Sequence, residues 1–486
     1  MIVKFDENSY ETRKLDRDRI HIEFRAFEHI PYCGRPADEM MQKLSIYVPE
    51  AYYRGESING YTLHTAPIFM PNTVGGYMPG PEEAPGVNFM GKTNTTVYAL
   101  EHGYIVVSAG VRGRGMTNSA GKNIGIAPAD IVDLKAAVRW LRFNKNTLPG
   151  DVEKIITNGT SAGGAMSSLQ ACTGDHPDYL PYLEEIEAAD TADHVFASSC
   201  YCPITNLENA DSAYEWEFCG INDYHRMKME MPDPKDIEAL KQAIDEQNGA
   251  VKPGPRWIPV DAVMSDKQIA LSADLKKIFP SYLNSLGLKD EEGNPLELNE
   301  DGTGTFIEFI EKHVLASAQK ELDHGHDLSK EENVTAWLEI KNGRAVSMDW
   351  RKYVVYRTRM KDTPAFDSLA MNTPENELYG SADIRFRHFT QFSNTHGEHG
   401  EIADQMQIKL MNPMYYIDDE KAVKAKHIRI RHGAVDRDTS LAISNMLYAK
   451  LMNQKIDVNL AHPWGIPHAG DYDLDELFAW IDNICK

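Results

Sequence analysis

The pattern of apolar positions predicts a fold in which strands and helices alternate. Short apolar runs bounded by Gly, Pro or Asn are typical of buried strands. Such runs are KLSIYVP from Lys43, APIFMPN from Ala66, GYIVVSAG from Gly103, VEKIITN from Val152 and HVFASSCYCPITN from His194. Between the third and fourth runs, Ile131, Leu134, Val138 and Leu141 recur at helical spacing. A strand–helix–strand rhythm predicts an α/β fold with a mostly parallel sheet and right-handed crossovers.

This rhythm stops after Asn206 and returns near the end of the chain. The intervening sequence is strongly charged, with helical patterns such as DPKDIEALKQAIDEQNG and TFIEFIEKHVLASAQKELDHG separated by turn residues. The strands HIRIRHGAVD and KIDVNLAHP and the helices TSLAISNMLYAKLMNQ and LDELFAWIDNIC then restore the rhythm. We therefore expect a core in two parts, residues 1–206 and 401–486, interrupted by a large, mainly helical lid insertion at residues 207–400.

Composition narrows the partners. The 486 residues carry a net charge of −23, which repels nucleic acid and anionic membrane surfaces. No apolar run approaches the length of a membrane span, and the N-terminal residues lack the pattern of a secretory signal. We expect a small-molecule substrate, no nucleic-acid or membrane partner and a cytoplasmic location, while the oligomeric state stays open.

The six cysteines are too few in a chain of this length to form a disulfide framework. Cys200 and Cys202 have CxC spacing within a predicted strand, a spacing compatible with a metal or redox site. Such a site needs further ligands, and none lie nearby in the sequence. We interpret the pair as buried thiols.

The stretch NGTSAGGAM holds the strongest chemical signal. Ser161 stands between Gly159 and Gly163 in a G-x-S-x-G pattern that follows a predicted strand and opens a predicted helix. This context is the nucleophile elbow, in which small neighbours allow a tight turn and the helix N-terminus offers free N–H groups to an oxyanion. A glycine-rich connector with an inert serine would have the same local pattern.

An elbow serine needs a carboxylate and a histidine from later strand ends, in that chain order. The segment VDRDTS offers Asp436 and Asp438, and the segment AHPWGIPHAG offers His462 and His468. Because His462 sits at the strand end, it suits a structural hydrogen bond. His468 lies in the loop beyond, so we favour Asp436 with His468.

An oxyanion hole in this architecture combines the N–H after the nucleophile with an N–H from the loop after an early strand. Ala162 follows the serine, and the loop NTVGGYMPG offers Gly75 or Gly76. That loop is also compatible with a plain turn that has no catalytic part.

The motifs GTSAGG, VGGYMPG, VDRD and PHAGDYD, in this order and with a long insertion before the last two, resemble those of bacterial tannases. The resemblance covers essentially the whole chain. It implies an α/β-hydrolase fold with a lid, the triad Ser161, Asp436 and His468, and a gallate ester substrate. Ester hydrolysis by such a triad needs no metal and no organic cofactor.

The resemblance also implies which residues hold the galloyl hydroxyls. They are Lys361 in RMKDTPAFD, Glu375 in TPENELYG, and Asp438. Carboxylates accept hydrogen bonds from phenols, and an ammonium stabilises a partly ionised phenol oxygen. A feruloyl-type esterase would share the triad but would not need these partners. The sequence also leaves open a serine peptidase of the prolyl-oligopeptidase kind and a non-catalytic α/β-hydrolase-like binding protein.

Overall fold

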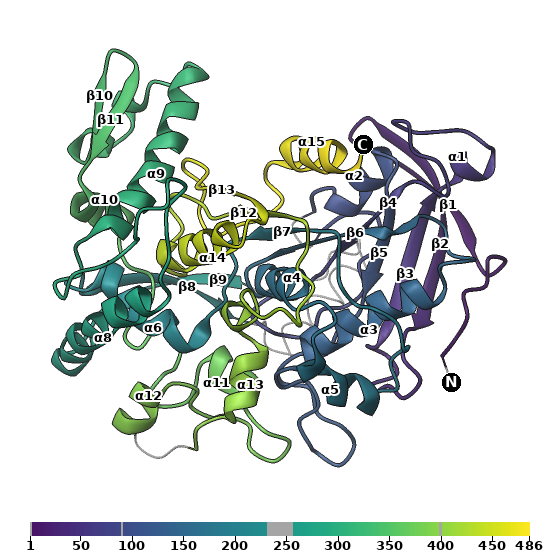
Figure 1. Cartoon of the computed structure of the whole chain (residues 1–486), viewed down its shortest axis with the longest axis horizontal. Helices are drawn as coiled ribbons and strands as arrows, with labels where there is room; N and C mark the ends of the chain where they lie inside the picture. Colours follow the sequence, from purple (N-terminus) through teal and green to yellow (C-terminus); the bar gives the residue numbers. More distant parts are fainter. Residues whose placement is uncertain (1, 89–90, 231–255, 398–400) are drawn as a thin grey trace, which may run out of the picture.

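The computed structural model describes residues 2–88, 91–230, 256–397 and 401–486. A nine-stranded sheet lies at its centre, in the order β1-β2-β3-β5-β4-β6-β7-β12-β13 (Figure 1). From β5 to β13 all neighbours are parallel, and β1, β2 and β3 extend one edge as antiparallel strands. The strands are β1 (Glu11–Arg17), β2 (Ile20–Pro31), β3 (Lys43–Pro49), β4 (Pro67–Pro71), β5 (Ile105–Ala109), β6 (Asp151–Thr160), β7 (Ala197–Tyr201), β12 (His427–Arg431) and β13 (Asp457–Ala461).

Helices cover both faces of this sheet (Figure 1). On one face, α2 and α15 contact each other, and Phe478 of α15 packs edge-on against Phe69 of β4 with 5.9 Å between ring centroids. On the other face, α3 packs beside α4, and α4 contacts β6 and β7. The core helices are α1 (Glu50–Tyr53), α2 (Thr95–Glu101), α3 (Ala129–Phe143), α4 (Ala162–Cys172), α5 (Leu180–Glu185), α14 (Leu441–Asn453) and α15 (Leu474–Cys485). The predicted α/β-hydrolase fold with its mostly parallel sheet is confirmed.

A long excursion separates β7 from β12, although these two strands are neighbours in the sheet. It contains most of the helices on the left and lower side of Figure 1. Its elements are α6 (Leu207–Phe218), β8 (Asp223–Glu230), β9 (Arg256–Val263), α8 (Asp266–Ser285), α9 (Thr305–Asp323), β10 (Leu338–Lys341), β11 (Arg344–Met348), α10 (Trp350–Arg357), α11 (Pro374–Leu378), α12 (Gln391–His396) and α13 (Gln405–Leu410).

The excursion is mainly helical, but it also contains two antiparallel strand pairs, β8–β9 and β10–β11, which we did not predict from the sequence. The second predicted helical stretch corresponds to α9. The first, DPKDIEALKQAIDEQNG, lies outside the described residues. Within the described ranges, no helix combines the length and apolar character needed to cross a bilayer.

The sheet register brings four loops to one edge. Thr160 pairs with Tyr201, Tyr201 pairs with Arg431, and Arg431 pairs with Ala461, each at or near the carboxyl end of its strand. In open α/β sheets, ligands bind outside these carboxyl ends. The loops that leave β6, β7, β12 and β13 therefore start side by side, and they carry the candidate residues.

Candidate active site

Ser161 occupies a sharp turn between β6, which ends at Thr160, and α4, which begins at Ala162. Its backbone angles are φ 62° and ψ −122°, a conformation that non-glycine residues rarely adopt. The surrounding backbone holds this strain, because the Ser161 N–H donates to Tyr201 O at 3.0 Å and the Ile204 N–H donates to Ser161 O at 3.2 Å. A strained, over-determined serine at a strand-to-helix turn is the geometry of a nucleophile elbow.

The glycines of this motif allow close crossing of the strand and the helix. A Cβ on Gly159 would lie 2.3 Å from the carbonyl oxygen of Gly163, and one on Gly163 would lie 2.6 Å from Asn72 Oδ1. A Cβ on Gly164 would lie 2.4 Å from Tyr201 O. Real Cβ atoms do not approach so closely, and the motif thus requires glycine at each of these positions.

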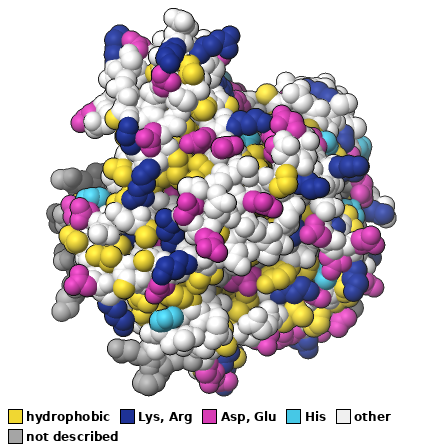
Figure 2. All heavy atoms as spheres, turned by 60° about the vertical axis from the view of Figure 1, so that its left-hand side comes forward, with side chains coloured by type: hydrophobic (Ala, Val, Ile, Leu, Met, Phe, Trp, Pro, Cys, Tyr) yellow, Lys and Arg dark blue, Asp and Glu magenta, His cyan; other side chains and the backbone are white. Residues whose placement is uncertain are grey.

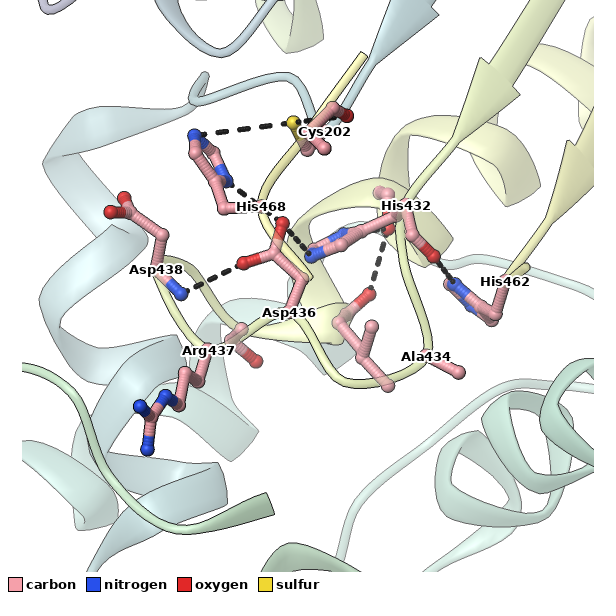
Figure 3. Close-up of polar contacts among 12 residues, drawn as sticks. Cys202, His432, Ala434, Asp436, Arg437, Asp438, His462 and His468 are labelled. Atoms are coloured by element: carbon pink, nitrogen blue, oxygen red, sulfur yellow. Dashed lines mark hydrogen bonds and ion pairs between the residues drawn. The ribbon is translucent and has the colours of Figure 1, made fainter. Parts of the chain in front are cut away.

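Asp436 and His468 meet beyond the ends of β12 and β13. His468 Nδ1 lies 2.8 Å from Asp436 Oδ2 (Figure 3). The Asp438 N–H donates to Asp436 Oδ1 at 2.8 Å, and His432 Nε2 lies 3.4 Å from Oδ2. Burial alone would raise the pKa of Asp436, but the two imidazoles and the hydrogen bonds hold it below its ordinary value.

His468 responds in the opposite sense. Its burial favours the neutral ring, but the carboxylates of Asp436 and Asp438 raise the pKa of His468 well above its ordinary value. An imidazole whose Nδ1 faces an ionised carboxylate is held in the orientation that leaves Nε2 as a proton acceptor. The arrangement can therefore act as a general base.

His462 has a different environment. It is fully buried, its Nδ1 lies 2.9 Å from His432 O, and its Nε2 lies 2.9 Å from Asn445 Nδ2. Burial and the neighbouring histidines lower the pKa of His462 well below its ordinary value. Figure 3 shows it on the far side of His432 from His468, as suits a structural histidine.

Cys202 lies beside His468, a position that the sequence analysis missed. Its Sγ is 4.0 Å from His468 Nε2 (Figure 3), and its chain neighbours Tyr201 and Ile204 bond the backbone of Ser161. Among the described residues, no hydrogen bond joins the Ser161 hydroxyl to His468. The position of Cys202 could have been inferred from the strand order, because this residue directly follows β7, which lies between β6 and β12 in the sheet.

Cys202, Asp436 and His468 are the described group of three potential metal ligands whose atoms lie within 4.8 Å of one another. His468 Nδ1 already faces Asp436, and burial raises the pKa of the Cys202 thiol, which disfavours the thiolate that binds metals. The six cysteines, all of them described, are free, and Cys200 and Cys202 are fully buried. The set fits an acid–base pair with an adjacent thiol better than a metal site.

A cavity of about 970 Å³ lies between Ser161 and the excursion. Ser161, Ala162, Lys361, Glu375 and Asp438 all line it. Of the two candidate glycines, Gly76 lines the cavity, and Gly75 is not among the described residues that do. The cavity is thus walled partly by the core and partly by the excursion. Figure 2, in which the left-hand side of Figure 1 comes forward, shows charged side chains of both signs among apolar ones.

Three ionisable side chains that line this cavity influence one another's charge. Lys361 Nζ lies 2.9 Å from Asp438 Oδ1 and 3.9 Å from the ring centroid of Phe366. Burial would lower the pKa of Lys361 and raise that of Asp438, but each holds the other charged. Glu375, at the start of α11, is 8% exposed, and burial raises its pKa. The cavity therefore offers a cation, an anion and a carboxyl group that is easily protonated.

Arg357 of α10 bonds the loop Asp436–Asp438, called the acid loop below, and was not identified from the sequence. Its guanidinium donates to the backbone oxygen of Asp436 and pairs with Glu217 of α6. Glu217 also accepts from the Ser440 hydroxyl at 2.6 Å and the Leu441 N–H at 2.9 Å. The excursion thus helps to position the loop that carries Asp436, and it also forms part of the cavity wall.

Comparisons with known proteins agree with this geometry. Residues 75–194 match the BD-FAE family model. Short segments resemble curated esterases of Mycobacterium tuberculosis; one, Esterase LipQ, is 38% identical over 88 residues, which span 18% of this chain and 20% of that protein. The chain therefore spans only about a fifth of that relative.

Solved structures match over the full length. Tannase from Fusobacterium nucleatum is 45% identical, with a TM-score of 0.91 and 99% of each chain covered. Tannase from Lactobacillus plantarum is 41% identical, with a TM-score of 0.92 and coverage of 99% of this chain and 100% of the other. A tannin acyl hydrolase solved in complex with ethyl gallate is also 41% identical, with a TM-score of 0.89 and 99% of each chain covered. Full-length identity at this level, together with the shared fold, shows that the chain belongs to the family of bacterial tannases.

Proposed function

We propose that this protein is a serine esterase that hydrolyses galloyl esters through an acyl-enzyme on Ser161. The observation that supports this most directly is the shared cavity, in which the elbow serine faces the same space as Lys361, Glu375 and Asp438. Related structures were solved with ethyl gallate and with 3,4-dihydroxybenzoate, two ligands with phenol hydroxyls on one ring.

In the proposed mechanism, the Ser161 hydroxyl attacks the ester carbonyl while His468 Nε2 takes its proton. Asp436 holds Nδ1 and stabilises the imidazolium, as the 2.8 Å contact allows. The N–H groups of Ala162 and of Gly76, rather than Gly75, stabilise the oxyanion. His468 then protonates the departing alcohol, and water attacks the acyl-enzyme to release gallate and restore Ser161.

The galloyl ring occupies the excursion side of the cavity. Asp438 and Glu375 accept hydrogen bonds from ring hydroxyls, and the Lys361 ammonium donates to a hydroxyl oxygen and stabilises its partial ionisation. In this proposal residues 207–400 act as the lid that supplies this pocket. A site built to bond substrate hydroxyls discriminates strongly against analogues that lack them.

The test compares hydrolysis of methyl gallate and methyl ferulate by the wild type and by Ser161→Ala. We expect rapid, serine-dependent release of gallate and slow or no release of ferulate. Equal rates or a preference for ferulate would favour a feruloyl-type esterase. If neither ester is hydrolysed, the proposal fails, and a panel of proline-containing peptides tests for a serine peptidase.

A further inference from the structure

Tyr214 of α6 links two segments that carry different parts of the proposed site. Its ring is fully buried against Phe218, at 4.7 Å between ring centroids, and Phe366, at 6.3 Å. Its hydroxyl donates to Arg437 O at 3.0 Å and accepts from the N–H groups of Met360 at 3.1 Å and Lys361 at 3.0 Å.

Each of these partners has a direct connection to the site. Arg437 stands between Asp436, which faces His468, and Asp438, which faces the Lys361 ammonium. Lys361 therefore meets the acid loop twice, through its side chain at Asp438 and through its backbone at Tyr214. Tyr214 itself is not among the described residues that line the cavity, so it does not belong to the galloyl-binding set.

The hydroxyl is fully used at this position. A phenol has one donor and two acceptor lone pairs, and the three contacts occupy all of them. Burial, opposed by the nearby Arg359 and Lys361, raises the pKa of Tyr214 to about 12, so the hydroxyl keeps its proton at neutral pH. Serine and threonine hydroxyls have the same bonding capacity. Their side chains are shorter than tyrosine by the length of the ring, so from α6 they would not reach both segments.

Neighbouring groups anchor the rest of the Lys361 segment. Arg359 Nε donates to Lys361 O at 2.5 Å, and its guanidinium pairs with Glu215 of α6. The Thr363 hydroxyl also donates to Glu215, at 2.7 Å. Because these bonds remain when the Tyr214 hydroxyl is removed, the segment stays folded while the Lys361 N–H and the Arg437 carbonyl lose their common anchor.

We propose that Tyr214 is a positioning residue that sets the distance between the galloyl-binding Lys361 and the triad loop at Asp436–Asp438, and thereby couples recognition of the galloyl ring to catalysis. This inference rests on the proposed function. A substitution far from the reacting atoms that misplaces a bound group by about 1 Å can lower a rate about a hundredfold. Loss of the hydroxyl should therefore impair galloyl esters selectively, since an ester without phenol hydroxyls does not use Lys361.

The experiment compares Tyr214→Phe with the wild type on methyl gallate and on p-nitrophenyl acetate. We expect kcat/KM for methyl gallate to fall by about 10- to 100-fold, mostly through kcat, and kcat/KM for p-nitrophenyl acetate to change by less than about threefold. The matched control is Tyr179→Phe, because Tyr179 is equally buried and donates to a backbone oxygen, Leu410 O at 2.6 Å. This control should leave kcat/KM unchanged for both substrates.

A second arm asks whether Tyr214 acts through Lys361. In a Lys361→Met background, Tyr214→Phe should cause little further loss on methyl gallate, because the group that it positions is gone. Equal losses on both esters, no loss on either, or full additivity with Lys361→Met would overturn the proposal. If the wild type does not hydrolyse methyl gallate, the proposed function fails and this inference fails with it, whereas an active wild type with unchanged selectivity in Tyr214→Phe rejects this inference alone.

If Tyr214→Phe does not fold, Tyr214→4-aminophenylalanine provides the same test. The amine keeps the ring shape and a donor for Arg437 but is a poor acceptor for the two N–H groups. We then expect the same selective loss on methyl gallate with near-normal thermal stability. A 4-aminophenylalanine variant with unchanged selectivity would count against the proposal.

Discussion

Asp438 donates its backbone N–H to the carboxylate of Asp436 at 2.8 Å, while its own carboxylate receives the Lys361 ammonium at 2.9 Å. A single turn after β12 thus orients the acid that faces His468 and forms part of the proposed galloyl pocket. The proposed catalytic acid, Asp436, and the proposed recognition group, Asp438, are two residues apart in sequence. Substitutions at Asp438 should therefore affect both the substrate contact and the His468 environment.

The first prediction concerns Asp436, the acid of the proposed triad. Asp436→Asn keeps the size of the side chain but removes the charge that orients and stabilises the His468 ring, and we expect kcat on methyl gallate to fall by about 10³- to 10⁴-fold. Stopped assays of gallate release measure this. The control is Asp457→Asn, which alters an exposed pair with His427 of the same type, 2.6 Å apart. A residual kcat above a tenth of the wild type would contradict the assignment.

The second prediction concerns the ammonium in the cavity. Lys361→Met removes the charge but retains much of the apolar side chain, and it leaves Asp438 without its partner. We expect kcat/KM for methyl gallate to fall by about 100-fold or more, with a much smaller change for p-nitrophenyl acetate. Lys312→Met is the control, because Lys312 lies on the surface of the excursion and pairs with Glu291. A similar fall for both esters would argue against a role in galloyl recognition.

The third prediction concerns the pH dependence. The general base must be neutral, so kcat/KM is lost as the pH falls through the pKa of His468. Because Asp436 and Asp438 raise that pKa, the acid limb for the free enzyme should lie above pH 6.5, the ordinary value. Asp438→Asn removes one of the two charges and should move the limb to lower pH.

The pH profile is best measured with p-nitrophenyl acetate, since Asp438 also faces the galloyl pocket. A profile that does not move in Asp438→Asn, or that moves to higher pH, would be inconsistent with this electrostatic coupling.

The fourth prediction concerns stability in acid. Burial lowers the pKa of His432 and of His313 to about 4, below the ordinary value of 6.5. The unfolded chain therefore binds more protons between these values. The contribution of these two neutral histidines to the free energy of unfolding is present in full above about pH 6.5. It is lost as the pH falls toward 4, by up to about 1.4 kcal/mol per pH unit for each histidine.

Urea unfolding at several pH values between 7 and 4.5 measures this loss. His313→Leu, on α9, should flatten the dependence of unfolding free energy on pH without abolishing it, since His432 remains. A slope identical to that of the wild type would show that His313 does not titrate in this way.

The fifth prediction concerns the elbow glycines. Gly159→Ala places a Cβ 2.3 Å from Gly163 O, which forces β6 and α4 apart. We expect a loss of about 1–3 kcal/mol in the free energy of unfolding and a marked loss of activity. Gly86→Ala is the control, because the closest atom to its Cβ is 4.0 Å away. Equal stability of the two variants, measured by urea unfolding, would refute the crossing argument.

Several elements followed from local sequence. Lys43–Pro49 and Leu474–Cys485 form a strand and a helix where their apolar spacing predicted them, because their partners lie within a continuous core. By contrast, β1 and β2 were not predicted. The residues of β1 are mostly exposed and charged, and such an edge strand forms through pairing with its neighbour rather than through its own pattern.

The sequence alone determined the α/β rhythm, the long interruption and the strand-to-helix turn at Ser161, and it gave the chain order of the proposed acid and base. These depend on short-range spacing and turn chemistry. Lys361 and Glu375 came only from the resemblance to a family, because nothing local distinguishes them from surface charges. Their place in one cavity with Ser161 was decided by the tertiary structure, as were the positions of Cys202 beside His468 and of Tyr214 between two loops. These residues lie dozens to hundreds of positions apart in sequence. The register of the sheet brings Cys202 and His468 together, and the packing of the excursion against the carboxyl edge of the sheet brings in Tyr214, Lys361 and Glu375.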